Sequence, residues 1–569
     1  MPCAPKKVCE GCNPCETIPG LIAIRDALLK DKLSQLKKER KIAHSDLVVG
    51  MLMRTADDAL GRGDERAAKA AAEKAILFSE RSPLPHFFLS RLYPLTDKES
   101  LGEYVTAIRL SAGNFWLLTS SIGIIGLALM IAFHLCLVTF LLYCFVHYIP
   151  LWIHYFRERL PAAVHNGSIL LVIVLFLFVF FFLLPPFWSL FISLFFFCFF
   201  YRQKEKGVAI AFLVGLIVFS FLLKPILLLL TAKQSVLLSQ MVTNQEGNFM
   251  GAAPSFDPSE IDWKVPFIKA AYETQENDLG EAETLYKQAL LKNPDNKKRI
   301  LNNLGNIAFY RNNFEEAMAY YQKAIGQDQN YVASHYNMGQ VHNEMFAFDK
   351  GQNKYIEAKK INQALTEYYA QSASKYPNHP VIEERFTQLE LWRQLFLLSW
   401  NSSEENNDIM AFWVGGLPWI PFLALIILIG VGGWFTCRKL KEYVHVEFCP
   451  ICKKAMCIQC QESLTNYNVC GACNTDMMTG VSKKQGNIPS RMTPFFIVPG
   501  GGQLTMQKPV LALCFLMPFY FSITLMAVGD VFLTSAHWHL SIAKSPLFPM
   551  TILFLYGSYF LDIYLKRER

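Results

Sequence analysis

Charge is scarce in this sequence, and that scarcity narrows the classes of protein to which the chain can belong. Asp, Glu, Lys and Arg make up 18% of the 569 residues, and the net charge of +7 is small for this length. No stretch combines basic and aromatic residues as a nucleic-acid-binding surface does, so we expect no nucleic-acid partner. Hydrophobic residues make up 52% and include 45 Phe, well above the average of soluble proteins. The composition therefore predicts a multi-domain integral membrane protein in contact with a lipid bilayer.

Cysteine is absent from the middle of the chain. Residues 231–436 contain none, whereas four of the 15 cysteines lie in residues 1–16 and six lie between Cys449 and Cys473. This distribution favours cysteine-rich ends in a reducing compartment and a central part on the other side of a membrane.

A signal peptide is also missing from residues 1–16, which contain no apolar stretch. Within this cysteine-rich tail, Cys9, Cys12 and Cys15 have C-x2-C-x2-C spacing, and Cys3 lies nearby. Such spacing is typical of zinc sites and of parts of iron–sulfur motifs. Because four cysteines so close together strain one tetrahedral site, metal binding and a disordered thiol-bearing tail both stay open.

A regular repeat extends over residues 301–362. Its small and aromatic packing positions recur in two copies, which pair Gly305 with Gly339, Ala317 with Gly351, Tyr321 with Tyr355, and Ala324 with Ala358. An earlier copy, whose offset is longer by one position, contains Ala282, Tyr286, Ala289 and Pro294. The small residues allow two antiparallel helices to approach each other, and the tyrosines fill the space between neighbouring pairs. One pair alone cannot bury its apolar face, so the pairs must stack.

This pattern resembles the tetratricopeptide repeat, whose period of about 34 residues it shares. The resemblance covers residues 282–362 and implies an α-helical solenoid whose concave side holds a partner peptide or protein. Such a role requires no catalytic residues, and we expect that the chain is not an enzyme. Residues 17–112 also have a helical pattern, in which Ala68 and Ala75 keep a seven-residue interval that favours one degenerate pair of the same kind.

Long apolar runs predict membrane-spanning helices on both sides of the repeat domain, which extends over residues 232–410. Three runs exceed the about 20 residues that cross a bilayer: residues 115–149, 207–231 and 411–436. A fourth run, residues 168–200, contains Pro185 and Pro186, so one kinked helix and a hairpin of two short spans are both compatible with it. At residues 494–565 a PGGGQL motif precedes two further apolar segments, which we expect to form a two-helix membrane unit. The fold class predicted is therefore an all-α membrane protein with a solenoid inserted between its transmembrane helices.

Basic residues beside these segments indicate their orientation, because cytosolic loops carry an excess of Lys and Arg. Clusters at residues 202–206 and 438–441 are therefore expected in the cytosol, and the repeat domain between them lies outside it. The side of the N-terminus stays open. A single kinked helix at residues 168–200 puts the N-terminus in the cytosol but places Arg157 and Arg159 outside it. A hairpin at these residues keeps Arg157 and Arg159 in the cytosol but places the N-terminus outside it.

The most specific chemical signal is a cysteine module at residues 444–476. Its six cysteines form three C-x2-C pairs: Cys449 with Cys452, Cys457 with Cys460, and Cys470 with Cys473. Each pair presents two thiolates in the geometry of tetrahedral zinc, and the module resembles a zinc ribbon or treble clef. Six ligands exceed one four-cysteine site and fall short of the eight that two sites need, so one and two ions both stay open. Because four thiolates leave no position for water, we expect the zinc to be structural.

These features favour a membrane-anchored scaffold for protein–protein interaction, with its repeat domain outside the cytosol and its zinc module inside. The combination resembles uncharacterised envelope proteins of bacteria, which implies the bacterial inner membrane as its location. An alternative is a subunit of an envelope export or glycopolymer-assembly machine, whose membrane helices would handle a lipid-linked substrate. Glycosyl transfer is disfavoured because the spans are few and the loop after the first span offers only Glu158 as an acidic residue.

Overall fold

The structure of the chain is a computed structural model, which describes residues 46–79, 81–93, 97–160, 168–169, 171–173, 184–247, 254, 256, 262–292, 297–376, 379–401, 411–443, 446–457, 461–464, 467–478, 495–535, 555–557 and 559–560. Helices dominate these residues, and the strands among them all belong to the cysteine module. Two compact units are formed by Met1–Leu118 with Thr231–Leu397 and by Thr119–Leu230 with Leu398–Arg569. The N-terminal tail with its four cysteines lies outside the described residues.

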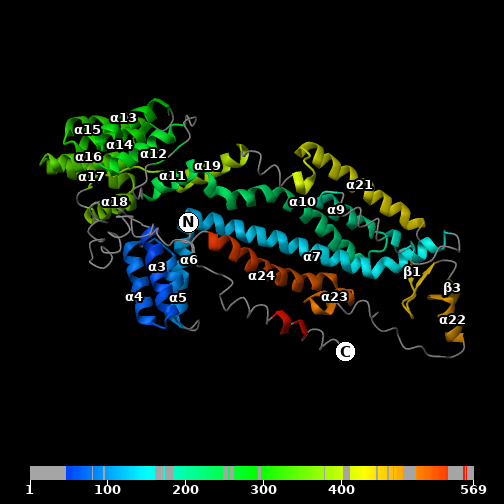
Figure 1. Ribbon diagram of the computed structural model, residues 1–569. Coiled ribbons are helices and arrows are strands. Elements are labelled where there is room, and N and C mark those ends of the chain that lie inside the picture. Colours follow the sequence, from blue (N-terminus) through cyan, green and yellow to red (C-terminus); the bar gives the residue numbers. More distant parts are fainter. Residues whose placement is uncertain are drawn as a thin grey trace, which may run out of the picture. The chain divides into compact units, whose positions relative to one another are not determined.

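Four helices open the described part of the first unit (Figure 1). They are α3 (Asp46–Gly61), α4 (Glu65–Phe78), α5 (Leu84–Leu92) and α6 (Lys98–Gly113). Helix α4 begins where the side chain of Asp64 accepts a hydrogen bond from the backbone N–H of Ala67. Ala68 and Ala75 are fully buried against α3, because small side chains let the two helices approach closely. The helical pattern is thus present, and its assignment as a degenerate repeat stays a prediction.

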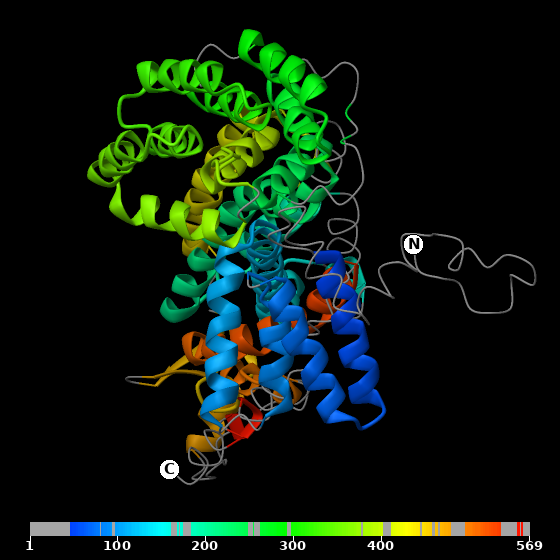
Figure 2. The same ribbon diagram turned by 90° about the vertical axis from the view of Figure 1, so that its left-hand side faces the viewer.

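The rest of the first unit is a curved stack of helices, drawn in green in Figures 1 and 2. Its elements are the 3-10 helix η1 (Ala232–Gln234) and helices α11 (Val236–Glu246), α12 (Lys264–Gln275), α13 (Leu279–Lys292), α14 (Lys297–Tyr310), α15 (Phe314–Gln327), α16 (Val332–Glu344), α17 (Phe348–Ile361), α18 (Gln363–Lys375) and α19 (Gln388–Asn401). Helices α12 to α17 pack as three successive pairs, which coincide with the three copies of the repeat. The stacked helix pairs predicted from the period of the repeat are therefore present.

Gly305 and Gly339 each lie where a tyrosine of the paired helix crosses. A Cβ atom on Gly305 would lie 2.5 Å from Cε1 of Tyr321, and one on Gly339 would lie 2.5 Å from Cε1 of Tyr355. Both distances are far below van der Waals contact. The period of the repeat thus reflects one packing contact that is made twice.

The turn inside each pair recurs as well. Asn277, Asn312 and Phe346 connect the two helices of successive pairs with positive φ angles of 67°, 59° and 58°. Asn adopts this left-handed conformation more readily than other residues with a side chain, because its short polar side chain bonds locally. The side chain of Phe346 cannot make such a local hydrogen bond, and Phe346 is 81% exposed. The third pair therefore carries backbone strain that the first two avoid.

The second unit is built around long apolar helices. They are α7 (Phe115–Arg157), α10 (Gln203–Thr231), α21 (Trp419–Tyr443) and α24 (Pro509–Ser535), with the shorter α9 (Pro186–Phe196) and α23 (Gly501–Thr505). Four segments of the described chain are long and apolar enough to cross a membrane: Phe115–Arg157, Gln203–Gln234, Ile420–Lys439 and Pro509–Val528. At 11 residues, α9 is too short to cross alone. Most of the predicted second helix of the C-terminal unit lies outside the described residues.

Helix α10 packs antiparallel to α7. A Cβ atom on Gly123, near the start of α7, would lie 2.9 Å from Cδ2 of Leu230, near the end of α10. Further along α7, the hydroxyl of Tyr143 donates to Oε1 of Glu205, in the first turn of α10, at 3.2 Å. The end of α7 and the start of α10 therefore lie at the same end of this unit.

Helix α24 also runs opposite to α7. Oγ1 of Thr524 donates to the backbone carbonyl of Ala128 at 3.1 Å, and the hydroxyls of Tyr520 and Thr139 lie 2.7 Å apart. As the residue number rises along α7 it falls along α24, so the start of α24 lies toward the end of α7.

Helices α9 and α21 run in the same direction. Near their starts, Nε1 of Trp188 donates to the backbone carbonyl of Val414 at 3.0 Å. Near their ends, Cys198 and Cys437 form a disulfide with a Cα–Cα distance of 6.1 Å. Because Cys198 comes shortly before Arg202 in the chain, the end of α21 lies close to the segment that leads into α10.

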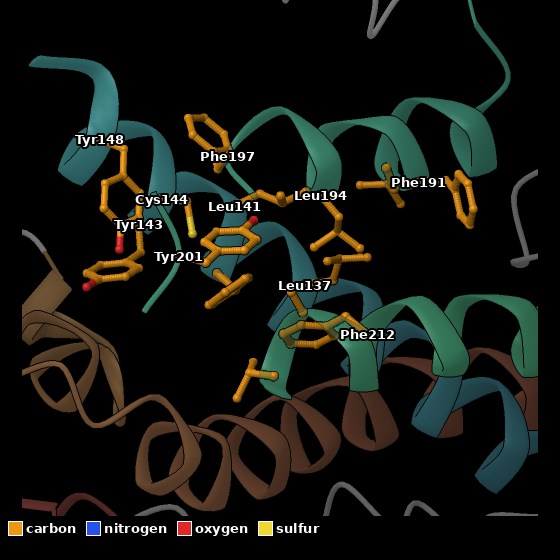
Figure 3. Close-up of a cluster of buried hydrophobic side chains, with 14 of the residues drawn as sticks. Leu137, Leu141, Tyr143, Cys144, Tyr148, Phe191, Leu194, Phe197, Tyr201 and Phe212 are labelled. Carbon is orange, nitrogen blue, oxygen red and sulfur yellow. The ribbon is translucent and has the colours of Figure 1, made fainter. Parts of the chain in front are cut away.

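A buried aromatic and aliphatic core joins α7, α9 and α10 (Figure 3). Leu137 and Leu141 on α7 lie against Leu194 on α9 and Phe212 on α10. Glu205 is also buried there, with 1% of its surface exposed. Its carboxylate accepts from the backbone N–H of Arg202 at 2.9 Å and from the hydroxyls of Tyr143 and Tyr148. It thereby caps the first turn of α10, which satisfies donors that the helix itself cannot pair.

The cysteine module consists of two β-hairpins and a short helix. Its elements are β1 (Val446–Phe448), β2 (Ala455–Cys457), β3 (Gln461–Leu464), β4 (Tyr467–Cys470) and α22 (Gly471–Met478). Both hairpins are antiparallel, with Val446 opposite Cys457 in one and Gln461 opposite Cys470 in the other. In the turn after β1, the backbone N–H of Cys449 donates to the carbonyl of Lys454 at 2.8 Å. This tight turn brings Cys449 and Cys452 to one side.

Candidate functional site

An extended segment of the chain lies along the first helices of the repeat pairs. Residues 379–387, which we name the docked segment, contain neither helix nor strand. Val381 has no exposed surface, and Ile382 and Phe386 are 9% and 3% exposed. The ring of Phe386 lies 5.3 Å from that of Phe267 on α12. The surface at which a solenoid of this kind offers room for a partner is therefore occupied here by the chain itself.

The backbone of the docked segment is held by asparagine side chains. Nδ2 of Asn303 donates to the carbonyl of Glu384 at 2.9 Å, and Oδ1 of the same residue accepts from the N–H of Glu384 at 2.9 Å. Asn337 makes the same pair of bonds with Ile382, at 3.0 and 2.7 Å. Each side-chain amide thus replaces one residue of a neighbouring strand, because it offers a donor and an acceptor side by side.

The two asparagines are equivalent positions of the repeat. Asn337 follows Asn303 by one full period, and the residues that they hold, Ile382 and Glu384, are two apart. The backbone groups of alternate residues point to the same side of an extended strand, so one repeat binds every second residue. Oδ1 of Asn244 on α11 continues the series, because it accepts from the N–H of Phe386 at 3.3 Å. We name Asn244, Asn303 and Asn337 the asparagine ladder.

Two further amides reinforce the ladder at Ile382. Nδ2 of Asn302 and Nδ2 of Asn306 donate to its carbonyl at 2.9 and 3.0 Å. Asn306 is positioned in turn by the buried hydroxyl of Tyr321, which donates to its Oδ1 at 2.7 Å. Since the aromatic ring of Tyr321 requires Gly305, the packing contact of the repeat also orients the polar groups that hold the docked segment.

An ion pair fixes the chain immediately after the docked segment. Nη1 and Nη2 of Arg299 donate to Oε1 and Oε2 of Glu390 at 3.0 and 2.9 Å. Glu390 also accepts from the backbone N–H of Thr387 at 2.8 Å and thereby caps α19. Burial alone would raise the pKa of Glu390, but the Arg299 guanidinium and the donors of Thr387 hold that pKa below its ordinary value.

A cavity of about 610 Å³ stays open at the other end of the stack, between α16, α17 and α18. Its lining includes the aromatic Tyr336 and Tyr355 and the polar Gln340, Lys359 and Glu367. It offers hydroxyl, amide and charged groups of both signs to a partner.

Four of the six predicted metal ligands come together in the cysteine module. Sγ atoms of Cys449, Cys452, Cys470 and Cys473 all lie within 4.8 Å of one another, and we name them the four-cysteine cluster. The first two come from the turn after β1, and the last two from the junction of β4 and α22. Sγ of Cys452 lies 3.6 Å from Sγ of Cys470. Cys460 lies outside the described residues.

This arrangement fits a tetrahedral metal ion. Zn–S bonds of about 2.3 Å place the sulfur atoms of a tetrahedron about 3.8 Å apart, which is close to the separation of Cys452 and Cys470. A disulfide requires about 2.05 Å between sulfurs. The cluster can therefore bind a metal ion through four thiolates, with no coordination position left for substrate.

The thiols of the cluster differ in acidity. Burial alone would raise the pKa of Cys449, but backbone N–H groups of Cys470, Cys452 and Ile451 lower it to about 6. Burial raises the pKa of Cys473 to about 12, and its three neighbouring thiols act in the same direction. The lowered pKa of Cys449 favours the thiolate, which is the form that binds metal, whereas a metal ion must displace the proton of Cys473.

Cys457 lies apart from the four-cysteine cluster. It ends β2, and its Sγ lies within 4.8 Å of ligand atoms of His154 and Glu158 on the C-terminal part of α7 and the turn after it. In the sequence, the interval between Cys452 and Cys470 fits a four-cysteine zinc site, whereas Cys457 and Cys460 could replace one of the outer pairs or hold a second ion with His445 or another group. The register of β1 and β2 makes the difference, since it directs Cys457 toward α7.

The asparagine ladder and the docked segment were missed in the sequence. A signal was present, because Asn303 and Asn337 obey the same period as the glycines and tyrosines. An amide at equivalent buried positions of a repeat is typical of a surface that binds backbone. The docked segment itself has no periodic signal, since it is held by residues that lie 45 to 142 positions away in the chain.

Comparison with known proteins bears on the repeat. No curated protein matches the chain. Residues 305–345 match the family model of the TPR repeat, and they comprise the C-terminal part of α14 together with α15 and α16. The tetratricopeptide resemblance is therefore confirmed for these residues, and the chain contains a TPR repeat.

Proposed function

We propose that this chain is a membrane-anchored scaffold for protein–protein interaction, whose repeats bind an extended segment of a partner protein. The asparagine ladder carries the proposal, because it holds alternate residues of an extended strand through their backbone groups. Backbone recognition of this kind gives affinity, while the pockets for alternate side chains give specificity. The role requires no chemical step, and we propose no enzymatic activity.

The docked segment would compete with such a partner. A ligand tethered within the same chain acts at a millimolar effective concentration when its linker is short and flexible. An external segment can bind only those chains in which the groove is open. Its apparent affinity is therefore its intrinsic affinity multiplied by the fraction of chains in that open state. We propose that release of the docked segment is coupled to partner binding.

Membrane anchoring is supported by the four apolar helices on either side of the repeat domain in sequence. The basic clusters at residues 202–206 and 438–441 support a cytosolic start of α10 and a cytosolic end of α21. We propose a bacterial inner membrane, with the repeat domain outside the cytosol and the cysteine module inside. For the four-cysteine cluster we propose zinc, because an all-thiolate tetrahedral site favours that ion and gives it a structural role.

A peptide with the sequence of the docked segment, HPVIEERFT, tests the ladder directly. In a full-length variant whose residues 379–387 are replaced by a Gly/Ser linker of equal length, we expect the labelled peptide to bind. The wild-type chain should bind at least about tenfold more weakly, because its own segment fills the groove. Fluorescence anisotropy in detergent measures both.

Matched controls separate backbone recognition from adhesion to an apolar surface. A peptide N-methylated at the positions of Ile382 and Glu384 keeps every side chain but lacks the two N–H donors, and it should not bind. Asn303→Ala with Asn337→Ala in the linker variant should remove binding as well. Failure of the unmodified peptide to bind the linker variant, or equal binding of the N-methylated peptide, would contradict the proposal.

A further inference from the structure

A second group of metal-ligating side chains lies outside the four-cysteine cluster. His154 lies in the last turn of α7 and Glu158 in the turn directly after it. The backbone N–H of Glu158 donates to the carbonyl of His154 at 3.2 Å, so the two side chains share one face. Nε2 of His154 lies 3.8 Å from Oε1 of Glu158. Sγ of Cys457 completes the group, and the three ligand atoms all lie within 4.8 Å of one another.

The three donors are of different chemical types, and together they select a class of metal. Imidazole nitrogen, carboxylate oxygen and thiolate sulfur are the ligands that zinc accepts, with bonds of about 2.0–2.3 Å. His154 and Glu158 approach from one face at the end of α7, and Cys457 approaches from β2. The three ligand atoms thus surround a common point. A site with three protein ligands keeps one coordination position for water.

Packing around the group keeps the strand and the helix together. Phe448 on β1 lies with its ring 5.1 Å from that of His147, two helical turns before His154 on α7. Val446 and Cys457 are buried in the same apolar core as Tyr148. The first hairpin of the cysteine module is therefore attached to α7 by burial on both of its strands. The juxtaposition of Cys457 with His154 and Glu158 follows from this packing.

We propose that His154, Glu158 and Cys457 form a second zinc site, which fastens the cysteine module to the end of α7. Its ion is distinct from that of the four-cysteine cluster, since the two sites share no ligand. The module has six cysteines, and the four-cysteine cluster uses four of them. Of the remaining two, Cys457 would bind the second ion together with His154 and Glu158. Zinc binding releases the thiol proton of Cys457 to solvent, while His154 binds as the neutral imidazole.

Metal content of the full-length protein, purified in detergent and measured by mass spectrometry, tests the proposal. We expect two zinc ions per chain for the wild type. His154→Ala and Cys457→Ser should each reduce the content to one ion, and Glu158→Gln should weaken the second ion at least about tenfold in a chelator titration. Cys514→Ser removes an exposed cysteine on α24 and should leave both ions in place.

Cobalt substitution identifies which ion is lost. His154 and Glu158 lie outside the hairpins, so their variants should retain the strong sulfur-to-cobalt absorption of a four-thiolate site. Loss of one ion with that absorption intact supports the second site. One zinc ion per wild-type chain, or an unchanged zinc content in the His154→Ala variant, would overturn the proposal. The peptide experiment on the repeat domain does not depend on either result.

Discussion

Gly305 is a position at which the repeat has no room for a side chain. In Gly305→Ala the new methyl group would lie 2.5 Å from the buried ring of Tyr321, which also orients Asn306. We expect overpacking to cost about 1–3 kcal/mol and to loosen the docked segment. Hydrogen exchange of the full-length protein, read at α14, α15 and residues 379–387, measures the loss of local stability.

Two other glycines provide graded controls for this prediction. Gly339→Ala makes the equivalent contact with Tyr355, whose side chain is only partly buried and can move, so its cost should be smaller. Gly326 in α15 has open space around its Cβ position, and alanine there should be neutral or stabilise the helix by up to about 1 kcal/mol. Equal effects at Gly305 and Gly326 would show that helix propensity, not packing, determines the outcome.

Phe346 offers the opposite test, because its substitution should stabilise the repeat. Its φ of 58° falls where the two equivalent turns have Asn277 and Asn312. Since the left-handed conformation costs most residues about 1–2 kcal/mol and Asn less, Phe346→Asn should slow hydrogen exchange in α16 and α17 by the equivalent of about 1 kcal/mol. Phe348→Asn changes another exposed aromatic residue, at the start of α17, and should bring no gain.

Among single residues, the sequence could predict those that make the same contact in successive copies of the repeat. Gly305 and Tyr321 were visible because the same contact recurs one period later, and the match over residues 305–345 confirms the repeat. Asn244 was not visible, because α11 lies outside the period and its role depends on the path of residues 379–387. A single residue with a non-repeated, long-range partner leaves no trace in local spacing.

Glu390 connects three elements: it pairs with Arg299 on α14, caps α19 and follows shortly after the docked segment. Its pKa is lower in the folded chain than its ordinary value. The corresponding stability is fully present above the ordinary carboxyl pKa of about 4.3 and is lost as the pH falls through the lowered value. Glu390→Gln should therefore destabilise residues 379–401 by about 1.5–3 kcal/mol at pH 7, and by much less near pH 3.

Hydrogen exchange at several pH values, corrected for intrinsic rates, measures this difference. The matched control is Glu383→Gln, which removes a carboxylate that pairs with Arg385 inside the docked segment but does not cap a helix. A cost for Glu390→Gln that stays constant down to pH 3 would exclude the ion pair as its source.

At the scale of elements, the sequence predicted where helices form better than it predicted which distant segments pack against them. The helix pairs follow from apolar and glycine spacing, which is local. The docked segment has no such spacing, and the separation of Cys457 from the other cysteines depends on the register of β1 with β2 and on α7, which lies far earlier in the chain. Ligand types and spacing predicted a metal module, whereas the grouping of its ligands required the fold.

For the whole molecule, helix directions bear on the question that charge alone left open. The C-terminal part of α7 lies beside the start of α10, as the contacts of Tyr143 and Tyr148 with Glu205 show. If the basic cluster at residues 202–206 makes the start of α10 cytosolic, then Arg157 and Arg159 at the end of α7 are cytosolic too. The chain between them must return to the side from which it came, which favours the hairpin at residues 168–200.

Reporter fusions test this topology. We expect green fluorescent protein to fluoresce after Arg159 and after Gln203, and alkaline phosphatase to be active after Asn248 and before Met1. The fusion after Gln203 is cytosolic in both topologies and serves as the control, so the fusion after Arg159 decides. Phosphatase activity there would establish a single kinked helix at residues 168–200 and would put Glu158 and the cysteine module on opposite sides of the membrane. The second zinc site requires Glu158 and the cysteine module on the same side of the membrane. Phosphatase activity after Arg159 would therefore exclude this site together with the hairpin.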